Sequence, residues 1–149
     1  MDKSAQQLSI YSWDVLSVED RRAKILELEA YSKTQPQVEL PPIELFGNGL
    51  YLRALKIPKN TVLVGEIHLQ ETMNIVMYGE IVVATDEGVK TIYGGDIFNS
   101  PAGTKRAGVA LEDTYWLVIH ATESTDIDKI KEEFIAPNYE ALSKHLEKM

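Results

Sequence analysis

Glu66 and His68 are the residues of this chain whose type and spacing first suggest chemistry. They lie two positions apart in the run from 61 to 69, whose β-branched residues predict a strand. Because alternate residues of a strand point to the same side, Val62 and Val64 are expected to share a face with this pair. An imidazole and a carboxylate on one face can ligate iron, manganese, nickel or zinc, or can move protons as an acid and a base.

The composition excludes several other classes of site and partner. The chain has no cysteine, which rules out disulfides, thiolate metal sites and a cysteine nucleophile. Its 15 basic and 23 acidic residues give a formal charge of −8, so we expect neither nucleic acid nor an anionic membrane as a partner. No signal-peptide pattern and no apolar stretch of about 20 residues is visible, and the expected location is the cytoplasm.

The elements that must position Glu66 and His68 are short β-rich runs between residues 50 and 120. No helical run interrupts them, so they predict an antiparallel sandwich or barrel rather than a parallel sheet. Turn-forming residues separate eight runs, which are Tyr51–Ile57, Thr61–Leu69, Thr72–Tyr78, Glu80–Thr85, Val89–Tyr93, Ile97–Asn99, Thr104–Leu111 and Thr114–Ala121.

Helical arms are expected on both sides of this β region. Ser17 followed by Asp20 forms a capping-box pattern, and apolar residues at helical spacing predict a helix over 18–32. Prolines between 36 and 42 cannot continue that helix, so this stretch is expected to be an extended strap. In the C-terminal arm, Thr125 or Asp126 can cap a further helix that Pro137 ends. The expected division is a helical arm and strap over 1–45, a β-barrel over 46–121 and a helical arm over 122–149.

One stretch of the β region resembles the first motif of the cupin superfamily, whose fold is a double-sheet jelly roll. That motif is written G-x5-H-x-H-x3-4-E-x6-G. At the same spacing this chain has, in order, Asn60, Glu66, His68, Thr72 and Gly79. Of the three ligand positions only His68 is kept. The resemblance covers roughly residues 50–120 and implies a mainly β, cupin-like jelly-roll barrel.

The second motif of that superfamily, G-x5-P-x-G-x2-H-x3-N, is matched in spacing by Gly95, Pro101, Gly103, Arg106 and Ala110. Arg106 stands at its histidine position. In metal-binding cupins three histidines and one glutamate hold a divalent ion inside the barrel, and the resemblance implies that His68 and Arg106 point into that space. The fixed positive charge of a guanidinium opposes a divalent ion. We therefore expect no metal or other cofactor, with His68 and Glu66 as the first two ligands of any metal site.

The same residues fit two sites without metal. In one, Glu66 and Arg106 form an internal salt bridge beside His68 and fix the strand register. In the other, Arg106 and His68 hold a carboxylate or phosphate in a pocket. The candidate ligand-binding residues are Glu66, His68, Thr72, Arg106, Tyr78 and His120.

A narrower resemblance links three stretches to small cupin-like proteins of tailed bacteriophages. The stretches are 65–68, 100–108 and 120–130. The resemblance implies a bacteriophage protein in the cytoplasm of its host.

Three functions stay open at this point. The favoured one is a small-molecule-binding protein, without turnover, for an anionic host metabolite or nucleotide signal. The second is an enzyme, either a metal-dependent oxygenase or an isomerase with His68 as its base and Arg106 stabilising negative charge. The third is a structural or interaction protein with the barrel as scaffold. A homodimer or higher homo-oligomer is expected, because the last strand is apolar on both faces and pairing protects edge strands.

Overall fold

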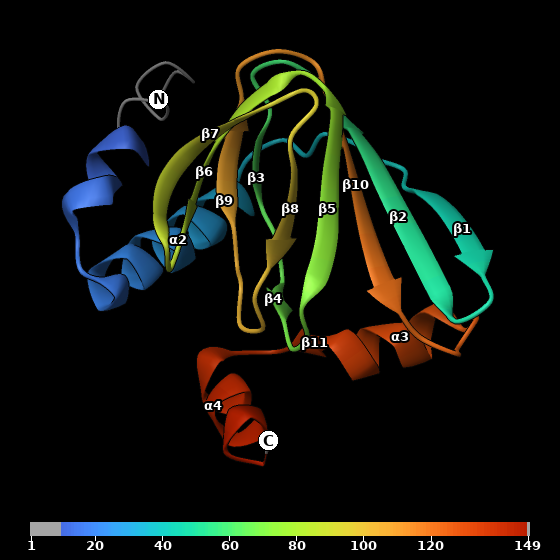
Figure 1. Ribbon diagram of the computed structural model, residues 1–149. Helices are drawn as coiled ribbons and strands as arrows, with labels where there is room; N and C mark the ends of the chain where they lie inside the picture. Colours follow the sequence, from blue (N-terminus) through green and yellow to red (C-terminus); the bar gives the residue numbers. More distant parts are fainter. Residues whose placement is uncertain (1–9, 149) are drawn as a thin grey trace.

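The structure of the chain is a computed structural model that describes residues 10–148. It is a sandwich of two antiparallel β-sheets, with one long helix against the outside of one sheet and two short helices across one end (Figure 1). The mainly β jelly roll with flanking helices that the sequence predicts is confirmed.

The two sheets interleave strands from distant parts of the chain, as a jelly roll requires. The first sheet has, in spatial order, β1 (Ile43–Gly47), β2 (Leu50–Ile57), β10 (Thr114–Ala121), β5 (Thr72–Tyr78) and β8 (Ile97–Ser100). The second has β3 (Val62–Val64), β9 (Ala107–Ala110), β6 (Glu80–Thr85) and β7 (Gly88–Tyr93). A two-stranded ribbon joins β4 (Ile67–His68) to β11 (Ile135–Ala136).

The main core lies between the two sheets and follows from the strand period of two. Ile57, Val76 and Trp116 point inward from the first sheet and meet Ile81 and Val83 of the second. Alternate residues of the same strands point outward, so each sheet also has an outer face that needs separate cover.

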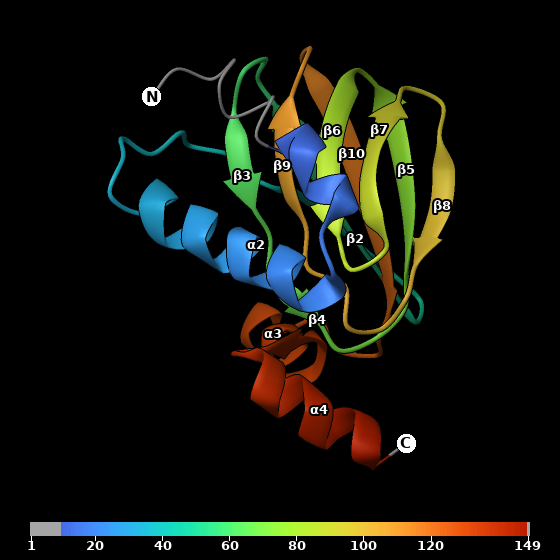
Figure 2. The ribbon, with the colours of Figure 1, turned by 90° about the vertical axis from the view of Figure 1, so that its left-hand side faces the viewer.

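The outer face of the second sheet is covered by the N-terminal arm, formed by η1 (Trp13–Val15) and α2 (Val18–Ser32) (Figure 2). Trp13 and Ile25 pack there against Val82 and Val109. The predicted cap is confirmed, since the Asp20 amide donates to Ser17 Oγ at 3.1 Å.

The predicted strand over 61–69 is wrong in one respect that matters for the site, because it is broken at Gly65 and Glu66. Before the break, Val62 and Val64 face helix α2, and Leu63 faces the core between the sheets. The expected shared face of Val62, Val64, Glu66 and His68 therefore does not exist. The assignment of the two valines to the inner face was wrong because the second sheet is covered on both faces. Apolar residues are therefore buried on its outer face as well as on its inner face.

The C-terminal arm closes one end of the sandwich. Asp126 caps α3 (Ile127–Phe134), and Asn138 caps α4 (Tyr139–Glu147). Phe134 and Ile130 pack against Tyr51 of β2 at the end of the barrel (Figure 1). Within residues 10–148 no helix is both long and apolar enough to cross a membrane.

The boundary expected at residue 45 falls inside strand β1, which starts directly after Pro41 and Pro42. The strap therefore covers residues 35–42, and the first sheet begins at Ile43.

Candidate functional site

A cavity of about 360 Å³ lies between the two sheets. Most of its wall is apolar, with Leu55, Ile81, Val83 and Val118 among the lining residues. Its polar lining residues are His68, Arg106, Arg53 and Glu66. The jelly roll thus brings His68 and Arg106, which are 38 positions apart in the chain, to one interior space.

Arg106 directly precedes β9, and its guanidinium lies among aromatic rings rather than carboxylates. Its Cζ atom is 5.1 Å from the centroid of the Trp116 ring and 5.7 Å from that of Phe98. An Nη atom donates to Ser100 Oγ. Among residues 10–148 no carboxylate forms an ion pair with Arg106. The guanidinium therefore has π-face contacts but no carboxylate within ion-pair distance among the described residues.

The expected salt bridge between Glu66 and Arg106 is not formed. Glu66 is exposed in the break between β3 and β4, and it has no ion-pair partner in the described part of the chain. Because the strand period is interrupted there, the side chains at 66 and 68 no longer have to point to the same side.

Burial lowers the pKa of Arg106 to about 10, and Glu87 opposes this effect. The guanidinium is therefore charged at neutral pH. A smaller cavity of about 110 Å³, lined by Glu87, Phe98 and Ser100, lies on another side of the same side chain.

His68 lies beside His120, with ring centroids 5.7 Å apart. The His120 ring also stacks on Tyr51 at 5.6 Å and meets the edge of Phe134 at 4.7 Å. The Nδ1 atoms of both histidines are buried and have no hydrogen-bond partner among the described residues. Burial, reinforced by neighbouring positive charge, lowers the pKa of each to about 4. Both imidazoles are therefore neutral at pH 7.

Thr72 and Tyr78 do not reach the cavity wall. Thr72 is buried, and its Oγ1 accepts from the Asn74 amide at 3.3 Å. Tyr78 is exposed and its ring meets that of Tyr115 at 5.6 Å on the far side of the sheet.

A buried polar network that the sequence reasoning missed holds the cation and its aromatic neighbour in place. Asn74 Nδ2 donates to Ser100 Oγ at 2.8 Å, and Asn74 Oδ1 accepts from the Trp116 indole at 2.9 Å. Ser100 in turn accepts from Arg106. Asn74 lies at an inward position of β5, and an amide there is a signal that could have identified it, because a fully buried polar side chain must find partners.

The residues at the cupin ligand positions do not fit a divalent metal. Glu66 is exposed, Thr72 is bonded to Asn74, and the fourth position carries a fixed cation. Within residues 10–148 no group of three histidine or acidic side chains is close enough together to hold an ion.

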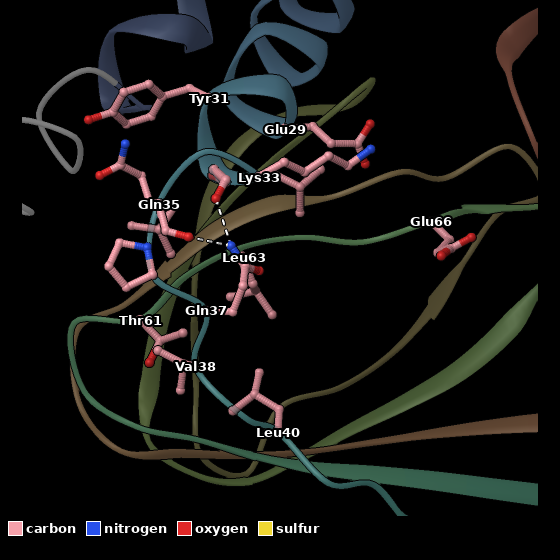
Figure 3. A pocket seen from close by; sticks show the side chains of 14 residues that line it. Glu29, Tyr31, Lys33, Gln35, Gln37, Val38, Leu40, Thr61, Leu63 and Glu66 are labelled. Atoms are coloured by element: carbon pink, nitrogen blue, oxygen red, sulfur yellow. Dashed lines mark hydrogen bonds between the residues drawn. The ribbon is translucent and has the colours of Figure 1, made fainter.

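A larger cavity, of about 670 Å³, is a groove elsewhere, between the end of α2, the strap and β3 (Figure 3). Glu66 lies at one end of it, well separated from the labelled strap residues Gln35 and Val38 (Figure 3). Glu29 also lines the groove and forms a salt bridge with Lys105, whose Nζ lies 2.8 Å from Glu29 Oε2. The groove offers no buried, unpaired charge, so the interior cavity is the stronger candidate.

No protein-family model matches this chain, and no curated protein matches it in sequence. Solved structures do match it in fold. A cupin superfamily protein from Desulfitobacterium hafniense DCB-2 has a TM-score of 0.50 at 15% identity, covering 59% of this chain and 82% of that one. KdgF from a Halomonas species has a TM-score of 0.50 at 20% identity, covering 62% and 88%.

A third similar structure is an uncharacterized conserved protein with a double-stranded β-helix domain from Klebsiella pneumoniae. Its TM-score is 0.51 at 14% identity, covering 62% of this chain and 85% of that one. At these identities the likeness concerns fold alone. Taken with the strand order of the two sheets, it shows that the chain has the fold of the cupin superfamily.

Proposed function

We propose that this protein binds a small organic anion in the cavity between its sheets, with Arg106 as the anchor. The observation that carries the proposal is a charged guanidinium in a mostly apolar cavity without a carboxylate partner. A buried charge of this kind is costly unless it is paired. A ligand carboxylate or phosphate supplies the missing partner, and the planar guanidinium can bind it through two hydrogen bonds.

The cavity also specifies the rest of the ligand. Its wall is apolar next to Arg106, and Trp116 presents an aromatic face. A ligand with one anionic head and an apolar or aromatic body satisfies both parts of the wall. At about 360 Å³ the cavity lies in the range of small-molecule sites.

Binding without turnover fits the site better than catalysis. A general base works best when its pKa is near the working pH, and the pKa of His68 is about 4. An imidazole of such low basicity is a poor acceptor for a substrate proton. The donor set does not fit the metal of an oxygenase, and we propose that binding requires no cofactor.

The resemblance to small phage proteins extends the proposal to a setting. In it, the protein acts in the host cytoplasm and sequesters an anionic host metabolite or a nucleotide signal. The phosphate of a nucleotide would meet Arg106, and its base would meet the aromatic and apolar wall.

The test is a thermal-shift screen followed by calorimetry, with phenylacetate, isovalerate, sugar phosphates and nucleoside monophosphates as probes. A ligand at 100 times its Kd stabilises a protein by about 2.7 kcal/mol, roughly 5–10 °C in Tm for a chain of this size. Arg106→Gln is expected to abolish the response, and Lys129→Gln is the control because it removes an exposed cation from α3, away from the cavity. The proposal is wrong if no anion shifts the Tm at millimolar concentration, or if Arg106→Gln responds like the parent.

A further inference from the structure

A second guanidinium, that of Arg53, faces the cavity between the sheets. Arg53 lies on β2 directly opposite Val118 of β10, and residues paired in register share a face of the sheet. Val118 packs in the core between the sheets, as does Leu55 two positions after Arg53, so Arg53 points to the same interior side. Arg53 and Arg106 both line the cavity of about 360 Å³. Its wall therefore has two permanent cations.

The two arginines lie toward opposite ends of this cavity. One inward row crosses the first sheet from β2 to β8 and consists of Arg53, Val118, Asn74 and Phe98. Three strand spacings separate the Cα atoms of Arg53 and Phe98, which is about 14 Å. The Arg106 guanidinium lies at the Phe98 end, 5.7 Å from that ring. The stems of both arginines take up part of this span and leave a gap of several ångströms between the two charges.

The surroundings of the two cations differ. Arg106 is half-buried, donates to Ser100 and lies over the Trp116 ring. Arg53 is exposed, so its end of the cavity is open to water. Within residues 10–148 neither arginine forms a salt bridge. The cavity thus has an inner cation that is fixed in place and an outer cation that a ligand meets at the opening.

Two carboxylates lie near Arg53 but outside salt-bridge distance in the described chain. Glu44 faces Arg53 from β1, and its charge adds to burial in raising the pKa of Tyr51. Glu66 lines the cavity wall and is exposed in the break between β3 and β4. Exposed carboxylates interact weakly with a cation through water. A ligand group next to Arg53 therefore displaces no formed ion pair.

The histidines beside the cavity show that the charge of Arg53 acts inside it. Burial is the main cause that lowers the pKa of His68 and His120 to about 4, and the charge of Arg53 contributes in both cases. Both imidazoles are neutral at pH 7, so the two arginines are the cations that a ligand meets there.

We propose that the cavity takes a dianion with its two acidic groups at opposite ends of an apolar body, one bound by Arg106 and the other by Arg53. This rests on the proposed binding of an anion at Arg106 and adds Arg53 as the residue that determines specificity. The apolar lining between the two cations, with Leu55, Val83 and Val118, contacts the body of the ligand. A monoanion occupies the inner end alone, whereas a dianion provides a partner for each guanidinium.

The test is calorimetry of the full chain at pH 7 with two probes of one shape. The dianion is para-phenylenediacetate, and the monoanion is para-tolylacetate, which has a methyl group in place of the second acidic arm. Carboxyl groups of this type are ionised at pH 7. We expect the dianion to bind about 5- to 10-fold more tightly, because the bound body holds the second carboxylate next to Arg53.

Arg53→Gln is expected to remove this preference and to leave the affinity for para-tolylacetate unchanged. Lys56→Gln is the matched control, since Lys56 lies on the same strand but on the outer face, with its Nζ 5.4 Å from the centroid of the Tyr115 ring. Circular dichroism verifies that each variant is folded, and Arg53→Met replaces Arg53→Gln if the latter is not.

The inference is overturned if the parent chain binds both probes equally, or if a folded Arg53 variant keeps the preference for the dianion. The proposed function survives either result as long as para-tolylacetate binds and Arg106→Gln abolishes that binding. If neither probe nor any other anion binds the parent chain, the proposed function is wrong, and the role of Arg53 is wrong with it.

Discussion

Replacing Arg106 by methionine removes the cation but retains most of the apolar stem of the side chain. The variant therefore distinguishes two roles of Arg106, the binding of a ligand and the stabilisation of the fold. Burial lowers the pKa of Arg106 from its ordinary value to about 10. At 1.36 kcal/mol for each pKa unit, the charged side chain costs the folded state about 3 kcal/mol.

The contacts that Arg106→Met removes are worth a similar amount. The guanidinium over the Trp116 ring contributes about 1 kcal/mol, and a hydrogen bond from a charged donor to Ser100 contributes about 2 kcal/mol. The two effects nearly cancel. The unfolding free energy of the ligand-free protein is therefore expected to change by less than about 1 kcal/mol.

Urea unfolding at pH 7 without added anion measures this difference. Removing one partner of a buried ion pair would instead cost about 3–5 kcal/mol. In calorimetry the same variant is expected to bind the ligand anion at least about 100-fold more weakly, because a desolvated charge partner is lost. A loss of more than 3 kcal/mol in stability together with unchanged binding would refute the reasoning and make Arg106 a structural residue.

Three further results are expected. The unfolding free energy is expected to fall as the pH is lowered from 6.5 to 4, because His68 and His120 stay neutral in the folded protein while the same histidines of the unfolded chain take up protons. Urea titrations at pH 7 and 4.5 measure this loss of stability. A loss of the same size in His120→Phe would contradict the proposed cause. Asn74→Ala costs about 2–3 kcal/mol in urea unfolding, because the indole of Trp116 loses its acceptor, and a change below 0.5 kcal/mol would discount the network. Ser17→Ala costs about 1 kcal/mol by the same measurement through loss of the α2 cap, and an unchanged midpoint would show that the cap contributes nothing.

The sequence predicted the fold well because its strands are separated by turn residues and its helices carry caps. The strands over 72–78, 80–85 and 114–121 and the helix over 18–32 were placed with the boundaries that the structure has. Strand β1 was missed because Pro41 and Pro42 directly precede it and Gly47 ends it. Its partners lie on β2 alone, so packing rather than local pattern establishes it.

The candidate site was harder to predict, because it depends on which side of a strand each residue faces. His68 and Arg106 do line one cavity. Glu66 was predicted to share their face because residues alternate along an unbroken strand. The break at Gly65 removes the basis for that prediction. Asn74 and Ser100, which hold the site together, carry no motif. They become visible only when three strands of the first sheet are paired.

The cupin motifs could be recognised in this sequence because backbone geometry constrains the residue types at their framework positions but not at their ligand positions. Gly79 has a φ of +111°, and a Cβ there would lie 2.5 Å from the carbonyl oxygen of Asp113. Gly95 and Gly103 also have positive φ values. Asn60, at the first glycine position of the motif, has a φ of +71° and is the one non-glycine residue of the described chain in that region. Asparagine tolerates this conformation better than most residues.

Turn geometry therefore maintains the spacing of both motifs whatever the barrel holds. The interior positions are free of that constraint, because a strand accepts many side chains at an inward position that borders a cavity. Arg106 stands where the second cupin motif has a histidine, so this position carries a permanent cation in place of a neutral imidazole, and the proposed ligand is an anion. In this chain the fold accounts for the positions of the site residues, and the single exchange at Arg106 accounts for the proposed preference for an anion.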